Sequence, residues 1–165
     1  MSVDPTRIEI AVNPMMTRMR GVATHGNTPF DVPYISNIAS NLWQGGCSDG
    51  MVVPSVIQHI VSLYPWERYH ANHDLRSELY FRMYDSTQQT FDQVDELARY
   101  VNARRATGPV LVHCQAGLNR SSLIAARALV LEGMSPKDAI ALIRVRRSPA
   151  CLCNPAFEQW LLQSA

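Results

Sequence analysis

The sequence predicts an α/β fold in which a central sheet, of about four to five mostly parallel strands, is flanked by helices. Short apolar runs rich in β-branched residues alternate along the chain with longer segments in which apolar residues recur every three or four positions. One such run, residues 109–113, is apolar at almost every position, which is typical of strands covered on both faces. This alternation indicates layers packed around one core.

Length and composition fit one domain. The chain has 165 residues, of which 47% are hydrophobic, which is enough to bury one core and too few for two typical domains. We divide it into an irregular N-terminal arm over residues 1–24 and one folded domain over residues 25–165. The arm contains two prolines and a methionine-rich run, residues 15–20, without a sustained period.

Three segments predict strands of the sheet. Residues 56–63 are apolar and β-branched, residues 79–84 alternate more, and residues 109–113 form the continuous apolar run. Upstream of these, the apolar positions of residues 35–43 lead to a glycine pair at residues 45–46, which we interpret as a turn signal.

The first predicted helix begins near Ser86, because Gln89 three residues later completes a capping-box pattern. Apolar residues then recur at spacings of three and four, at Phe91, Val94, Ala98 and Val101. This pattern predicts about five turns of helix that end near Gly108.

Start and stop signals predict three more helices in the last third of the chain. One begins around Arg120 and stops at Gly133. The next begins with Ser135 as N-cap and Pro136 at the first helical position. The last begins with the Asn-Pro pair at residues 154–155 and carries its large apolar residues on one side.

The charge balance excludes a global attraction to nucleic acid or to an anionic membrane, because 15 Lys and Arg against 14 Asp and Glu give a net charge of +1. No stretch approaches the roughly 20 apolar residues of a membrane span, and residues 1–5 lack the pattern of a signal peptide. We therefore expect a cytoplasmic protein whose four cysteines are free thiols.

The segment from Cys114 to Ser121 joins the buried strand to the following helix, which is where an α/β sheet places its ligand. The residues between Cys114 and Arg120 suffice for a cup of converging N–H groups, with the positive end of the helix behind them. Gly117 permits the close approach or positive φ that such a loop needs, and Arg120 offers a planar fork to two phosphate oxygens. The loop is therefore predicted to bind phosphate or another oxyanion.

The same surroundings favour the anionic form of Cys114. Converging amides and a helix N-terminus stabilise a thiolate as well as a phosphate, so the sulfur is predicted to be a nucleophile at neutral pH. Its attack on phosphorus would form a phosphocysteine and divide one displacement into two easier steps. This chemistry requires no metal and no cofactor, and the five histidines show no metal-ligand pattern.

The motif His-Cys-x-x-Gly-x-x-Arg-Ser, which begins at His113, resembles the signature of cysteine-dependent protein phosphatases. The surrounding sequence is similar to the small dual-specificity branch of these enzymes. The resemblance extends from residues 42–46 through the loop to Arg147 and to residues 154–157.

This resemblance implies roles for the loop and its neighbours. His113 would order the loop and tune Cys114, Arg120 would bind and stabilise the transferring phosphoryl group, and the Ser121 hydroxyl would assist the thiolate as it leaves. The bound phosphate would be held by the loop residues Gln115, Ala116, Gly117, Leu118, Asn119 and Arg120.

The resemblance also requires a general acid, and Asp85 is the match. It follows the predicted strand at residues 79–84, and the segment from there to Cys114 is long enough for one helix and one strand, so both residues are expected at the same edge of the sheet. Asp92 is the second candidate, although it falls inside the predicted helix, and Asp74 is the third. A turn or N-cap aspartate is the structural alternative for Asp85.

The implied function is a protein phosphatase that acts on phosphotyrosine, with phosphoserine and phosphothreonine as further candidate substrates. Residues 117–120 also resemble the loop of RNA 5′-triphosphatases of the same superfamily, but a net charge of +1 argues against an RNA-binding surface. A third alternative is an inactive phosphate-binding module, against which the complete set of candidate residues argues.

Other polar residues receive structural interpretations. Asn154 resembles a family asparagine, but N-capping explains it and we assign it no catalytic role. The basic residues Arg144, Arg146 and Arg147 are interpreted as a solvated helix end, with attraction of an anionic substrate to the mouth of the pocket as the alternative. We interpret Cys47, Cys151 and Cys153 as core or surface thiols. For Cys151 and Cys153 the alternative is a thiol that resolves oxidised Cys114.

Overall fold

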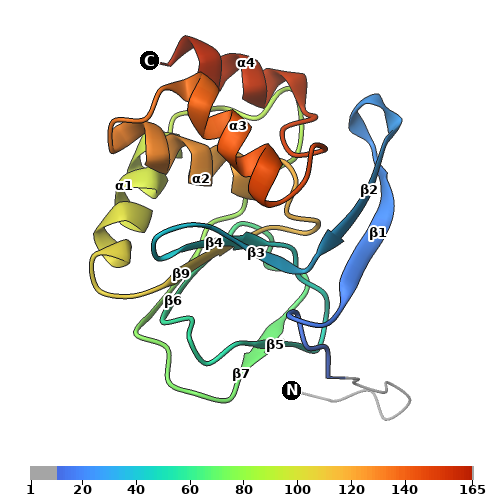
Figure 1. The fold of residues 1–165 in the computed structure, drawn as a ribbon, viewed down its shortest axis with the longest axis vertical. Coiled ribbons are helices and arrows are strands. Elements are labelled where there is room, and N and C mark those ends of the chain that lie inside the picture. The colour runs from blue at the N-terminus through green and yellow to red at the C-terminus, as the bar shows by residue number, and fades with distance from the viewer. Residues whose placement is uncertain (1–10, 165) are drawn as a thin grey trace.

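A five-stranded sheet forms the centre of the protein in the computed structural model, which describes residues 11–164 (Figure 1). The strand order is β3 (Ile35–Ala39), β4 (Leu42–Gly45), β9 (Val110–His113), β6 (His59–Ser62) and β8 (Ser77–Tyr80). Only β3 and β4 run antiparallel, and the other three pairings are parallel. The predicted fold class is thereby confirmed, and β9 lies in the middle of the sheet.

Four helices pack on one face of this sheet (Figure 1). They are α1 (Val94–Arg105), α2 (Arg120–Leu131), α3 (Pro136–Arg146) and α4 (Pro155–Gln163). Nine residues of α2 are buried, because α2 contacts β4 and β9 below it and each of the other three helices. The main core therefore lies between the helices and the sheet.

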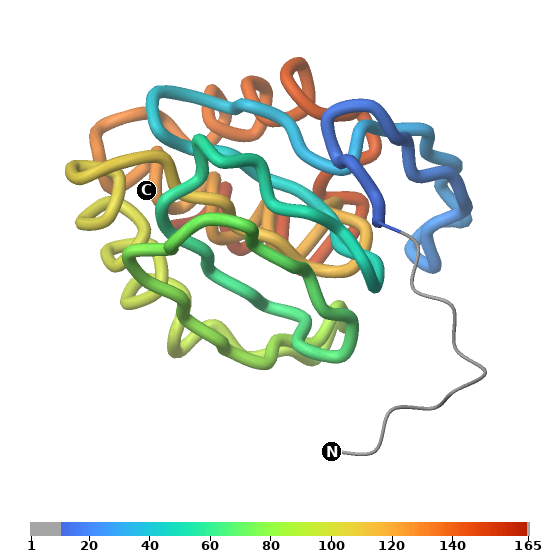
Figure 2. Tube along the Cα trace, turned by 90° about the horizontal axis from the view of Figure 1, so that it is seen from below, coloured from blue at the N-terminus to red at the C-terminus, as the bar shows by residue number. Residues whose placement is uncertain are grey.

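The opposite face of the sheet is covered by a parallel strand pair, β5 (Met51–Val53) and β7 (Tyr69–Ala71), with its connecting segments (Figures 1 and 2). A second, smaller core forms here around Met51, Ile60 and Leu111. Because successive side chains of a strand point to opposite faces, β9 supplies Leu111 to this core and its neighbouring valines to the main one.

The predicted starts of α2, α3 and α4 are confirmed. The Ser135 hydroxyl accepts a hydrogen bond from the Asp138 N–H at 3.1 Å, and the Asn154 side-chain oxygen accepts one from the Ala156 N–H at 3.1 Å. Gly133 ends the α2 region with a φ of 110°, a conformation that L side chains rarely adopt.

The helix predicted from Ser86 begins only at Val94, so that prediction was wrong for its first two turns. The Ser86 hydroxyl accepts from the N–H of Gln88 rather than of Gln89, and the Gln89 side chain accepts from the Tyr84 N–H at 2.8 Å. These local bonds fold residues 86–93 into turns instead of a helix.

The predicted N-terminal arm is partly wrong as well, because β1 (Arg18–Ala23) and β2 (Thr28–Pro33) form an antiparallel hairpin. Their connection is the short 3-10 segment His25–Asn27, where Gly26 and Asn27 both have positive φ, at 66° and 47°. Gly-Asn is a turn signal that the prediction overlooked. Residues 1–10 of the predicted arm lie outside the described residues.

Candidate active site

The loop from Cys114 to Asn119 lies at the carboxyl end of β9 and leads directly into α2. Since β9 is the middle strand, this loop has neighbouring elements on either side of it. The carbonyl groups of its residues point outward to partners that these elements supply. Cys114 O accepts from His113 Nδ1 at 3.1 Å, Gln115 O from Cys47 N at 2.9 Å, Ala116 O from Arg147 Nη2 at 2.9 Å, Gly117 O from Arg147 Nε at 2.6 Å and from Gln44 Nε2 at 3.0 Å, and Leu118 O from Leu152 N at 2.8 Å.

The N–H groups of this loop therefore face the opposite way, into the cup, because the C=O and N–H of a trans peptide point in opposite directions. Within the described part of the chain, the N–H groups of residues 115–119 donate to no backbone oxygen. A ring of free amide donors at a helix N-terminus is the arrangement that binds phosphate.

Gly117 is required at its position for two reasons. Its φ is 72°, and a Cβ there would lie 2.5 Å from Arg147 Nη2 and 2.5 Å from the carbonyl carbon of Gly45. The glycine pair that we interpreted as a turn signal also serves close packing, because a Cβ on Gly46 would lie 2.5 Å from the Gln115 carbonyl oxygen. The cup thus depends on close packing at Gly117 and Gly46, where neighbouring atoms leave no room for a side chain.

Cys114 sits at the base of the cup and is 2% exposed. Its sulfur lies 3.4 Å from the Ser121 hydroxyl oxygen in the first turn of α2. Gln44 on β4 donates from Nε2 to the same hydroxyl oxygen at 3.1 Å, which leaves the Ser121 hydrogen free to point at the sulfur. The hydroxyl can therefore donate to a thiolate.

Arg120 is buried beside the cup, and its guanidinium lies over the Tyr64 ring at 5.1 Å. Its Nη1 donates to the Met83 carbonyl at 3.2 Å, which fixes the plane of the fork. Its Nε is buried and finds no acceptor among the described residues. A tetrahedral oxyanion in the cup supplies such an acceptor.

His113 is fully buried, and burial lowers its pKa to about 4. The nearby positive charge of Arg120 acts in the same direction, whereas the bond to the Cys114 carbonyl acts against it. The ring is therefore neutral at pH 7 with its proton on Nδ1, where it donates to that carbonyl.

Asp85 lies on the segment after β8 and faces the loop, as predicted. Its Oδ2 accepts from Asn119 Nδ2 at 3.0 Å, and its Oδ1 accepts from Asn154 Nδ2 at 3.0 Å. His25 Nε2 of the hairpin connection lies 3.0 Å from the same Oδ1. The alternative candidates Asp92 and Asp74 do not line this pocket.

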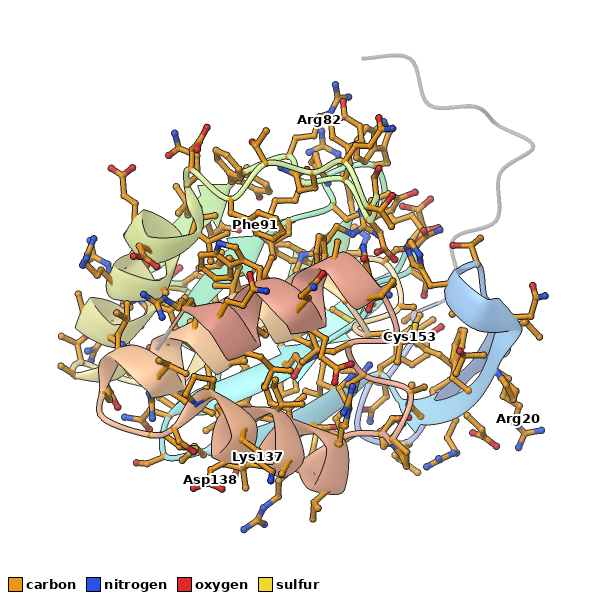
Figure 3. All side chains as sticks on the ribbon, turned by 90° about the horizontal axis from the view of Figure 1, so that it is seen from above. Arg20, Arg82, Phe91, Lys137, Asp138 and Cys153 are labelled. Carbon is orange, nitrogen blue, oxygen red and sulfur yellow. The ribbon has the colours of Figure 1, made fainter. Side chains whose placement is uncertain are left out.

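The cup opens into a pocket of about 310 Å³ that the loop, Asp85 and the hairpin enclose together. The loop contributes Cys114, Gln115, Ala116, Leu118, Asn119 and Arg120, and the hairpin contributes Met19, Val22, Ala23, Thr24 and Phe30. In Figure 3, the label of Arg20 marks the hairpin, and Cys153 lies on the side of the helices that faces it. Much of this hairpin wall, residues 19–24, thus comes from the segment that we expect to be an irregular arm.

Asn119 and Gln115 differ in their placement. Although Asn119 lines the pocket, its side chain binds Asp85 and the Asn154 N–H rather than pointing freely into the cup. The side chain of Gln115 is exposed. What these two positions offer a phosphate is their backbone.

The interpretation of Arg147 as part of a solvated helix end is wrong. This side chain is buried and donates to Gly117 O and Ala116 O behind the cup, and also to Pro33 O and Ser36 Oγ. Burial lowers the pKa of its guanidinium. The resemblance that extends to Arg147 was the available signal, whereas the burial of Arg147 beside exposed Arg146 comes from the tertiary packing of α3.

Three further residues of the site escaped the sequence interpretation. Gln44 holds the base of the loop, Asn154 binds Asp85 in addition to capping α4, and His25 contacts Asp85 across 60 positions of sequence. The resemblance at residues 42–46 and 154–157 was the available signal for the first two. No sequence pattern pointed to His25.

Within the described residues, no cluster of three or more His, Cys, Asp or Glu side chains has the arrangement of a metal site. All four cysteines are free thiols, as expected. No helix in residues 11–164 has both the length and the apolar character that crossing a bilayer requires.

Comparison with known proteins gives a match over two thirds of the chain. The family model of the dual specificity phosphatase catalytic domain matches residues 53–165. Among curated proteins, a similar sequence is MAP kinase phosphatase with leucine-rich repeats protein 3 of Dictyostelium discoideum, 37% identical over 65 residues. That match spans 39% of this chain and 8% of the relative's length.

Solved structures share the fold at low sequence identity. Human DUSP28 has a TM-score of 0.66 and 18% identity, with 79% of this chain and 92% of that chain covered. The human tyrosine phosphatase-like serine/threonine/tyrosine-interacting protein has a TM-score of 0.64 and 20% identity, with 79% and 94% covered. These likenesses show that the chain shares the fold of those two proteins.

Proposed function

Because the chain belongs to the dual-specificity phosphatase family, we propose that it is a cysteine-dependent phosphatase that removes phosphate from phosphorylated proteins. The observation that carries this proposal is that Cys114, Arg120 and Asp85 line one pocket. A nucleophile, a cation for the transferring group and an acid for the leaving group are together what displacement at phosphorus requires.

In the first step, the Cys114 thiolate attacks phosphorus from the base of the cup. A sulfur–phosphorus bond forms while the bond from phosphorus to the substrate oxygen breaks, and Asp85 transfers a proton to that departing oxygen. The loop N–H groups together with Arg120 Nε and Nη2 hold the three equatorial oxygens, where negative charge is greatest.

In the second step, the Asp85 carboxylate takes a proton from water as the water oxygen attacks phosphorus. The sulfur–phosphorus bond breaks, inorganic phosphate forms and the thiolate is regenerated. The Ser121 hydroxyl, 3.4 Å from the sulfur, donates a hydrogen bond to the departing thiolate. Neutral His113 contributes by fixing the Cys114 carbonyl, and with it the direction of the loop amides.

The hairpin wall supports phosphotyrosine as the preferred substrate. Met19, Val22 and Phe30 present apolar surface above the cup, which favours an aromatic ring over the short side chain of phosphoserine or phosphothreonine. These shorter substrates remain part of the proposal, with lower turnover expected.

The test replaces the nucleophile. Cys114→Ser is expected to abolish hydrolysis of phosphotyrosine peptides, by at least about 10³-fold, because removing a covalent nucleophile leaves only binding and electrostatic stabilisation. Binding of the same peptide by calorimetry should persist, since the cup amides and Arg120 are unchanged. Substantial turnover by this variant would contradict the proposal.

The same assays separate the alternatives. Release of γ-phosphate from triphosphate-ended RNA, faster than release from phosphopeptides, would assign the RNA triphosphatase function instead. Binding of phosphopeptides by the wild-type protein without any turnover would assign a phosphate-binding module.

A further inference from the structure

The carboxyl group of Asp85 is held by three side chains, and their hydrogen-bonding directions can be assigned from atoms outside the pocket. The Asn154 Oδ1 accepts from the Ala156 N–H at 3.1 Å, so its Nδ2 must be the atom that faces Asp85. The Asn119 Oδ1 accepts from the Asn154 N–H at 2.8 Å, so its Nδ2 likewise faces Asp85. Both asparagines are therefore donors to the carboxyl group.

One tautomer of His25 satisfies both of its contacts with Asp85. Its Nε2 lies 3.0 Å from Asp85 Oδ1 and also 3.2 Å from the Asp85 backbone carbonyl oxygen. A carbonyl oxygen can only accept, so both contacts are hydrogen bonds when Nε2 carries the proton and donates. Half-buried between hairpin and loop, the ring is 15% exposed, which shields these bonds from water.

The two oxygens of Asp85 are thus unequal. Oδ1 receives donors from His25 and Asn154, which occupy its two lone-pair directions, whereas Oδ2 receives one donor, from Asn119. An oxygen that accepts two N–H donors has no position left for a proton. When Asp85 is protonated, its proton is therefore on Oδ2, the oxygen on the side of the Cys114 loop.

We propose that His25 is a positioning residue of this site, which together with Asn154 confines the transferable proton of Asp85 to Oδ2. The inference rests on the proposed phosphatase function. It gives the hairpin a second role beside its apolar wall, because the connection between β1 and β2 orients the general acid. The proton goes from Oδ2 to the leaving oxygen, and His25 is unchanged by the reaction.

The test uses the dependence on the leaving group. His25→Ala is expected to lower kcat for phenyl phosphate about 10-fold, a part of the 10²–10⁴-fold that a general acid supplies, and to change kcat for p-nitrophenyl phosphate less than about 2-fold. An activated leaving group departs without a proton, so the rate for p-nitrophenyl phosphate does not depend on which Asp85 oxygen carries the proton. His25→Gln, whose amide can donate to Oδ1, should recover part of the loss.

Two comparisons separate positioning from a structural role. Arg20→Ala, on the same hairpin and outside the pocket lining, should leave both substrates unaffected. In an Asp85→Ala background, His25→Ala should change neither rate by more than about 2-fold, because the group it positions is gone. Equal losses for both substrates, or an undiminished loss without Asp85, would overturn the inference.

A measurement without turnover keeps this inference distinct from the proposed function. The side-chain carboxyl ¹³C resonance of Asp85 should shift in His25→Ala and stay in place in Arg20→Ala. An unmoved resonance in His25→Ala refutes the contact, whatever the activity. A wild-type protein inactive toward every phosphate ester would instead refute the proposed function, and the positioning role of His25 with it.

Discussion

His113 shows at the scale of one residue how burial selects a protonation state. The ring is enclosed next to the positive charge of Arg120, its pKa falls to about 4, and its Nδ1–H fixes the Cys114 carbonyl. The motif indicated that His113 orders the loop. The protonation state was not predictable from the sequence, because it depends on how completely α2 and the Tyr69 ring, which meets the imidazole edge-on, exclude water.

We predict that the free energy of unfolding falls by about 3 kcal/mol as the pH is lowered from about 6.5 to 4 because of His113. In this window the unfolded chain binds a proton that the folded protein excludes, so the stability is complete above pH 6.5 and is lost toward pH 4. His59, whose pKa burial also lowers, acts in the same direction. Urea denaturation at pH 7, 5.5 and 4.5 measures the effect.

The control for this prediction removes the titrating group. His113→Asn should flatten the dependence of stability on pH. Identical slopes for His113→Asn and the wild type would show that other groups are responsible.

At the scale of elements, local signals decided which parts could be predicted. The starts of α3 and α4 follow from N-caps and prolines that act within one turn, the end of the α2 region follows from Gly133, and the apolar run of β9 is equally local. The β1–β2 hairpin was missed because its strands are exposed on much of their surface and lack an apolar period. The contacts that hold it come from parts of the chain remote in sequence, because His25 binds Asp85, and Ala23 and Phe30 pack against the main core.

The hairpin yields a prediction about substrate preference. Phe30→Ala should lower kcat/KM for phosphotyrosine peptides about 3- to 10-fold, corresponding to the roughly 0.5–1.5 kcal/mol of an aromatic contact, and should change the value for phosphothreonine peptides less than about 2-fold. Matched peptides with one phosphorylated position measure both values. The physical reason for the expected fall is that the phosphotyrosine ring loses its contact with the Phe30 ring.

Controls address the stability of the hairpin itself. Val22→Ser changes the exposed part of the same wall without touching the core and should weaken phosphotyrosine turnover in the same direction. Tyr100→Ala, on α1 and away from the pocket, should leave the preference unchanged. A parallel fall for both phosphopeptides in Phe30→Ala would rule out the wall as the source of preference.

At the scale of the whole molecule, Arg147 connects parts of the chain that are far apart. From the end of α3 it binds the loop carbonyls of Ala116 and Gly117, the end of β2 through Pro33 and the start of β3 through Ser36. The fold class was predictable because it follows from the alternation of strands and helices. The burial of Arg147 was not predictable, because packing between distant elements decides which charged side chain becomes buried.

Arg147→Met is predicted to lower the free energy of unfolding by about 3 kcal/mol, because several buried acceptors lose their donor at once. For a chain of this size, the melting temperature should fall by roughly 6 to 12 °C. Thermal denaturation followed by circular dichroism provides the measurement. Arg146→Met, at the exposed neighbouring position, is the matched control and should shift the transition by no more than about 2 °C.

The support of Asp85 by His25 and Asn154 has a consequence for biosynthesis. During translation, the segment that carries Cys114 leaves the ribosome before residue 154 has emerged. At that stage Asp85 lacks the donor that Asn154 supplies to its Oδ1. Complete support of the Asp85 carboxyl therefore forms only after the start of α4 has been synthesised.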